Sequence, residues 1–140
     1  MMWYTAHSIV DADVTLNREG DAYHGDIQPS TVMLTDFSNT PDVKTIDSTL
    51  VHLNKGTYDR MLFDRNVKAA VSPEICEQLE QKKVKPIFEP TKQESWALGM
   101  TMLCQANNTT LDDYYDWKIP RVRYDAVQDG LDNIDRNYSN

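Results

Sequence analysis

Three titratable residues early in the chain are the first candidates for chemistry. His24 and Asp26 lie two positions apart, and Asp47 follows a short apolar run further along. A carboxylate can act as a general base or bind Mg²⁺, so Asp26 and Asp47 could form a magnesium pair. The plainer interpretation is that His24 is a packed histidine bonded to backbone groups and that the two carboxylates bind no metal. We expect the plainer interpretation to hold, with no metal site.

Other polar clusters have similarly plain interpretations. The acidic run at 112–117 (DDYYDW) lacks the alternating D-x-D-x-D-G spacing of a calcium loop, which favours a solvated acidic turn anchored by aromatic rings over a calcium or partner site. The basic run at 82–85 (KKVK) is predicted to be a solvated face. Cys76 and Cys104 fall in predicted helices and are expected to be small core residues.

Four short motifs then follow one another in a fixed order. The run at 24–31 (HGDIQPST), with the apolar residues after it, resembles the H-R-D-L-K-P-x-N catalytic loop of eukaryotic protein kinases. The run at 43–49 (VKTIDST) is similar to the strand that leads into the kinase D-F-G, with Asp47 in place of its aspartate. The run at 72–74 (SPE) resembles A-P-E, and the run at 94–99 (ESWALG) resembles the D-x-W-S-L-G that opens the central helix of the kinase C-terminal lobe.

The resemblance implies a mainly α fold, a kinase C-lobe-like helical domain with a small β-hairpin at the catalytic and D-F-G-like loops. Residues 1–140 would form a single truncated domain without the kinase N-terminal lobe. The resemblance also assigns a structural role to the residues of the two later motifs, which are Ser72, Pro73, Glu74, Glu94, Trp96 and Gly99.

The same resemblance implies that phosphotransfer is lost. Asp26 stands for the catalytic base, but Gln28 replaces the loop lysine and Thr31 replaces the loop asparagine that binds Mg²⁺. Neither a G-x-G-x-x-G loop nor a V-A-I-K-like strand occurs in the sequence. We therefore expect no enzymatic activity and no cofactor, with a set of vestigial catalytic residues: His24, Asp26, Gln28, Thr31 and Asp47.

Local patterns predict the elements that carry these motifs. Residues 32–34 and 43–46 should pair as a hairpin, and residues 48–71 should form a long loop. A helix should run from Ser72, as its N-cap, to Gln81. The pattern of residues 2–16 alone fits either an alternating strand or a helix, and the resemblance favours the helix, as the first long helix of the lobe.

Two longer helices are expected after residue 90. Thr91 and Glu94 form a possible capping box at the start of a buried central helix over 91–106. Its predicted buried side chains are Trp96, Leu98, Met100 and Leu103. The last helix begins at Tyr124, with its apolar residues on one stripe: Tyr124, Val127, Leu131 and Ile134.

Composition limits the classes of partner. The chain has 22 acidic and 14 basic residues and a formal net charge of −8, which argues against a nucleic-acid partner. No apolar run approaches the roughly 18–20 residues that span a bilayer, and no secretory signal is recognisable. Two cysteines make no disulfide framework, so we expect a reducing, cytoplasmic location, with possible association with the cytoskeleton or a large complex.

Three classes of function remain open. We favour a non-catalytic pseudokinase lobe that acts as a structural or interaction subunit of a larger multi-protein assembly. The alternatives are a residual or split kinase completed by another chain, and a regulatory module that binds an active kinase or its substrate. A protein partner is expected on the apolar face that residues 32–34 and Ile46 form on the predicted hairpin, or on the neighbouring 48–71 loop.

Overall fold

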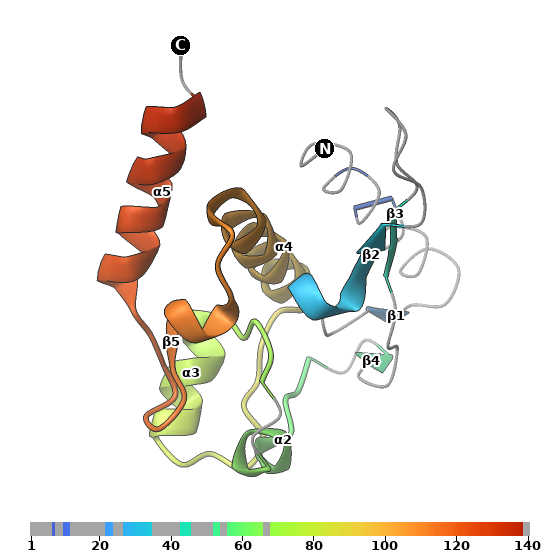
Figure 1. Cartoon of the computed structure of the whole chain (residues 1–140). Helices are drawn as coiled ribbons and strands as arrows, with labels where there is room; N and C mark the ends of the chain where they lie inside the picture. Colours follow the sequence, from blue (N-terminus) through green and yellow to red (C-terminus); the bar gives the residue numbers. More distant parts are fainter. Residues whose placement is uncertain are drawn as a thin grey trace.

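The structure is a computed structural model that describes residues 27–32, 56–65 and 68–138 in full. It also describes the backbone alone of 22–23, 33–34, 43–45 and 52–53, and the isolated helical positions 7, 10 and 11. The described part is mainly helical, as predicted. Helix α4 lies at its centre, with α5 along one side, α3 and α2 at one end and the β2–β3 hairpin on the side away from α5 (Figure 1).

Four helices have described bounds: α2 (Arg60–Asp64), α3 (Pro73–Glu80), α4 (Pro90–Asn107) and α5 (Tyr124–Tyr138). Two 3-10 turns, η1 (Pro29–Thr31) and η3 (Leu111–Asp113), precede strands. The strands pair in three antiparallel pairs within the described ranges: β1 (Ala22–Tyr23) with β4 (His52–Leu53), β2 (Val32–Leu34) with β3 (Val43–Thr45), and β5 (Tyr115–Asp116) with β6 (Arg121–Val122).

The β2–β3 hairpin confirms the pairing predicted between the two motif-bearing strands. Its register joins Val32 to Thr45 and Leu34 to Val43. The turn between the strands, and most of the helix expected over 2–16, lie outside the described residues.

The prediction of one long loop over 48–71 is wrong. This segment contains β4 and α2, and some of its hydrogen bonds join it to distant residues. Tyr58 N–H donates to the Pro86 carbonyl at 2.8 Å, and Phe88 N–H donates to the Gly56 carbonyl at 2.8 Å. Gly56 has a φ of +56°, and a Cβ there would lie 2.6 Å from the Phe88 oxygen, so a glycine is required for this approach.

Helix α3 confirms the helix predicted after Ser72, which is its N-cap residue, and Gln81 is its C-cap. Helix α4 begins one residue before the predicted range, and its N-cap lies two residues before the predicted cap, Thr91. The N-cap is Glu89 and Pro90 occupies the first helical position, so Thr91 is inside the helix and forms no capping box with Glu94. The fixed φ of proline suits the first turn, where its missing N–H is not needed.

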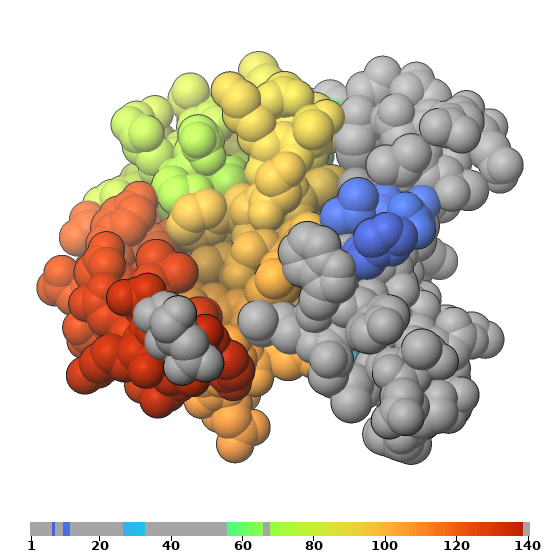
Figure 2. All heavy atoms as spheres, turned by 90° about the horizontal axis from the view of Figure 1, so that it is seen from above, coloured from blue at the N-terminus to red at the C-terminus, as the bar shows by residue number. Residues whose placement is uncertain are grey.

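Helix α4 is the buried central helix that the sequence predicts. Met100 and Leu103 are buried as expected, whereas Trp96 and Leu98 are only half-buried and pack at the edge of the core. Both cysteines are buried, which confirms their expected place in the core. Figure 2 shows α5 beside α4, and the two helices are in contact.

Side chains of α4 pack closely against the α5 backbone at Gly130. A Cβ on Gly130 would lie 3.1 Å from Leu103 Cδ1, so glycine leaves the room that this contact needs. Asn107 Nδ2 donates to the Gly130 carbonyl at 3.2 Å. The helix predicted from Tyr124 is α5, and its apolar residues differ in burial: Val127 and Ile134 pack on the core, whereas Tyr124 and Leu131 are exposed.

Candidate functional site

The η1 turn contains the two replaced kinase-like positions, Gln28 and Thr31. The Gln28 N–H donates to Thr31 Oγ1 at 3.1 Å, and Thr31 Oγ1 donates to the Gln28 carbonyl at 3.0 Å. The Thr31 N–H donates to the same carbonyl at 3.0 Å. Thr31 is 3% exposed, so its hydroxyl is used inside the turn.

The side chain of Gln28 ties η1 to the chain that leads into α3. Its Nε2 donates to the Lys68 carbonyl at 3.1 Å, across 40 residues of sequence. Helix α4 also packs against η1. The turn is therefore held between α4 and the segment before α3.

A hollow of about 410 Å³ opens beside this turn. Lys68 and Asp112 lie on its rim and form an ion pair of 2.8 Å. Trp117 Nε1 also donates to Asp112 Oδ1 at 2.7 Å. The hydrogen bond from Lys68, followed by that from Trp117, lowers the pKa of Asp112 below its usual value. The other residues of the hollow are Gln28, Pro29, Ser30, Thr110 and Leu111.

The Lys68–Asp112 ion pair places a positive and a negative group side by side on the rim of this hollow. The Lys68 amine, which is the cation beside the replaced loop lysine position, already faces a carboxylate at 2.8 Å. A phosphate approaching this amine would therefore also meet the Asp112 carboxylate. Pro29 and Leu111 add apolar surface to the wall of the hollow.

Three predicted site residues, His24, Asp26 and Asp47, lie outside the described residues. Of the others, Gln28 and Thr31 come together in η1, and Ser72 lies next to α4. Glu94 is buried on α4, whereas Gly99 is exposed. Pro73 and Glu74 line a different hollow of about 380 Å³, next to the ion pair between Arg121 and Glu80.

The residue that joins the SPE motif to α4 is Gln93, which sequence reasoning missed. Its Oε1 accepts from the Ser72 N–H at 2.7 Å, and its Nε2 donates to the Ala70 carbonyl at 2.9 Å. Gln93 is 5% exposed. Its spacing to Ala97, Met100 and Cys104 places it on the buried helix face, and this spacing could have identified it.

A second chain of hydrogen bonds holds the same segment. Trp96 Nε1 donates to Tyr115 Oη at 2.8 Å, and Tyr115 Oη donates to the Val71 carbonyl at 2.7 Å. Burial is the main cause that raises the pKa of Tyr115 above its usual value, so the phenol stays a donor. Tyr115 stacks on Trp117, with ring centroids 4.7 Å apart. Residues 70–72 are therefore fixed from α4 and β5 together.

Nothing in the described ranges adds a nucleophile or a metal centre. Burial raises the pKa of Cys76 to about 12 and of Cys104 to about 11, so both thiols stay protonated near neutral pH. The fully and partly described segments contain no group of three or more His, Cys, Asp or Glu side chains that could hold a metal ion. No helix among them is long and apolar enough to cross a bilayer.

The chain was compared with known protein families, curated proteins and solved structures. No family model, no curated protein and no solved structure matches this chain.

Proposed function

We propose that this chain is a non-catalytic, pseudokinase-like C-lobe that acts as a structural or interaction subunit of a protein assembly. Its four ordered motifs resemble those of the kinase C-terminal lobe, and the hairpin expected between the first two of them forms. The proposal includes the absence of a cofactor and a reducing, cytoplasmic location.

The bonding of Gln28 and Thr31 supports this proposal most directly. At these positions phosphotransfer would need a cation on the transferred phosphate and a ligand for Mg²⁺. Both side chains are neutral, and both bond to the backbone of η1 or of Lys68. Gln28 and Thr31, which bond to nearby backbone groups, thus stand where a kinase has the lysine and the asparagine that take part in phosphotransfer.

The SPE and ESWALG motifs support the structural part of the proposal. The segment 70–72 is joined to α4 by Gln93 and, through Tyr115, by Trp96. These bonds preserve the fold of the lobe and need no catalytic residue. A split kinase completed by another chain, or a module that binds an active kinase, would use the same contacts, so a nucleotide experiment has to separate the classes.

Calorimetric titration of the isolated chain with Mg·ATP tests the proposal. We expect no heat of binding up to millimolar nucleotide, because no phosphate-cradling loop or strand lysine occurs in the sequence. The matched control is Asp112→Asn, which frees Lys68 without touching the motif residues and should also bind no nucleotide. Micromolar binding by the parent chain would contradict the proposal and favour the split kinase.

A further inference from the structure

Helix α5 presents an apolar stripe to solvent. Tyr124, Leu131 and Tyr138 are 60%, 49% and 63% exposed. They lie seven residues apart, which is two helical turns, so they share one face. We call these three side chains the α5 stripe. Val127 and Ile134, on the neighbouring face, pack on the core, so the stripe lies beside the buried face of the helix.

Acidic side chains border the α5 stripe. Asp125 and Asp132 each follow a stripe residue, and Asp135 lies within one turn of Leu131 and Tyr138. All three are exposed. The helix carries four aspartates and one arginine, so a second α5 would be repelled, whereas a basic surface would be attracted.

A basic surface with an apolar centre occurs elsewhere on the same chain. Met61, Val84 and Ile87 are 49%, 67% and 70% exposed. Their segments lie together, because the Arg60 N–H donates to the Val84 carbonyl at 3.0 Å and Thr57 is bridged to Ile87. Three exposed lysines flank Val84 in the connection between α3 and α4. We call the apolar residues and these lysines together the basic patch: Met61, Val84, Ile87, Lys82, Lys83 and Lys85.

The backbone under the basic patch is held in place. Gln78 Nε2 donates to the Ile87 carbonyl at 2.7 Å, and the Ile87 N–H donates to Gln78 Oε1 at 2.9 Å. The exposed Ile87 side chain is thus presented from a fixed backbone. An apolar centre with a polar, solvent-accessible rim is the usual anatomy of a protein interface.

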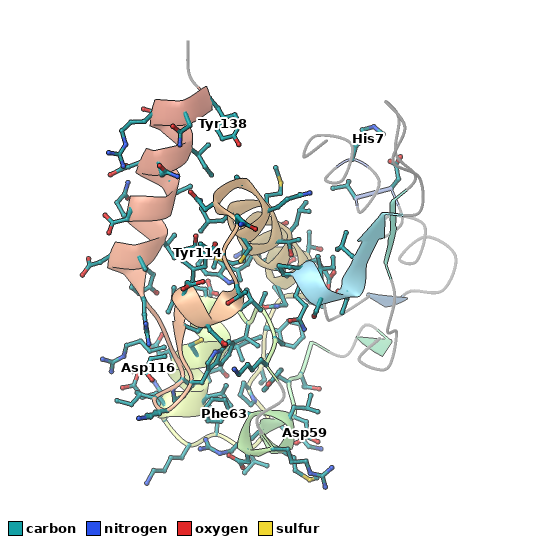
Figure 3. The ribbon with its side chains drawn as sticks, viewed as in Figure 1. His7, Asp59, Phe63, Tyr114, Asp116 and Tyr138 are labelled. Carbon is teal, nitrogen blue, oxygen red and sulfur yellow. The ribbon has the colours of Figure 1, made fainter. Side chains whose placement is uncertain are left out.

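Within one chain the outer end of the α5 stripe lies away from the basic patch, whereas Tyr124, at its inner end, lines a hollow together with Glu80 of α3. Tyr138 labels the outer end of α5, whereas Asp59, which precedes α2 and the basic patch, labels the opposite end of the molecule (Figure 3). We propose that the α5 stripe of one copy docks on the basic patch of a second copy. The contact is head-to-tail, because different surfaces of the two copies meet.

The charge and size of the surfaces set the expected strength. Three apolar side chains on each side make a small interface, for which we expect micromolar, transient association. Because aspartates face lysines at its rim, raising the salt should weaken it, as the Debye length falls from about 10 Å at 0.1 M to about 3 Å at 1 M.

A mixing experiment tests the head-to-tail contact. Leu131→Glu removes the α5 stripe and Val84→Glu removes the basic patch, and both positions are exposed, so circular dichroism and melting should match the parent. In sedimentation velocity, each variant alone should remain monomeric, with self-association weakened about 30-fold or more. An equal mixture should form a dimer and no larger species. The Val84→Glu variant keeps an intact α5 stripe and the Leu131→Glu variant keeps an intact basic patch, so each copy has one intact surface.

The control is Gln128→Glu, which adds the same charge to α5 beside the stripe. This variant should keep or strengthen association, because its carboxylate faces the lysines of the second copy. Self-association of Val84→Glu would overturn the proposal in favour of an α5–α5 contact. A parent chain that stays monomeric up to millimolar concentration at low salt would overturn it as well, and would leave these surfaces to a different protein. Neither result depends on nucleotide binding, so the proposed function is tested separately.

Discussion

Replacement of Gln93 by alanine should lower the free energy of unfolding by about 2–5 kcal/mol, because two buried backbone groups lose a side-chain partner at once. The Ser72 N–H loses its acceptor at 2.7 Å, and the Ala70 carbonyl loses its donor at 2.9 Å. Ser72 is 3% and Ala70 2% exposed, so water does not reach them without local opening. Urea denaturation followed by circular dichroism measures the loss.

Two variants make this experiment specific to the amide. Gln105→Ala changes an exposed glutamine of the same helix and should alter stability by less than about 0.5 kcal/mol. Gln93→Glu keeps the acceptor for the Ser72 N–H but has no donor for Ala70 while it is ionised. Burial should raise its pKa in the folded state, so this variant should be most stable at acid pH and lose stability as the pH rises. Equal unfolding midpoints for Gln93→Ala and Gln105→Ala would show that the amide does not hold residues 70–72.

Trp96→Ala should destabilise the chain by about 3 kcal/mol, at the lower end of the range for removing a large aromatic side chain. Trp96 is only half-buried, which limits the apolar loss, but its Nε1 bond to Tyr115 Oη is lost as well. Tyr115 is 1% exposed and is joined in turn to the Val71 carbonyl. Thermal unfolding measures the effect.

Trp96→Phe separates the two contributions. It keeps most of the ring and removes the N–H, so its cost should be close to that of one hydrogen bond, about 1 kcal/mol. A melting temperature of Trp96→Ala within about two degrees of the parent would mean that Trp96 does not support the core.

The sequence predicts those parts of the fold whose signals are local. The turn residues between 34 and 43 predict the β2–β3 hairpin, and the Ser72-Pro73-Glu74 start predicts α3, as observed. The apolar residues around α4 predict that it is central. In each case the deciding side chains and backbone groups lie within a few residues of one another.

Features held by distant residues could not be predicted in this way. The pairing of β1 with β4 and the bonds between residues 56–60 and 84–88 join segments far apart in the sequence, so residues 48–71 resemble a loop when read alone. The apolar stripe of α5 indicates a helix but does not say which half of the stripe meets α4. That is decided by the Gly130 contact with Leu103.

The candidate site was predicted only in part. The motif order identifies Gln28 and Thr31 as replaced positions, but their bonds to the backbone depend on the geometry of η1. The Lys68–Asp112 pair spans 44 residues and no short motif indicates it. Gln93 was missed because the motif match begins at Glu94, one residue later.

Phosphate transfer by the complex that purifies with the tagged chain is the most direct test of the proposal that this chain acts through its surface and not through chemistry. The purification should be done once with the parent chain and once with Asp26→Asn, which changes the residue that stands for the catalytic base in the proposed resemblance, and each preparation should be incubated with labelled ATP and a mixture of protein substrates. We expect both preparations to contain the same subunits and to transfer phosphate at the same background rate. Transfer by the parent assembly that disappears with Asp26→Asn, while the subunits remain together, would contradict the claim.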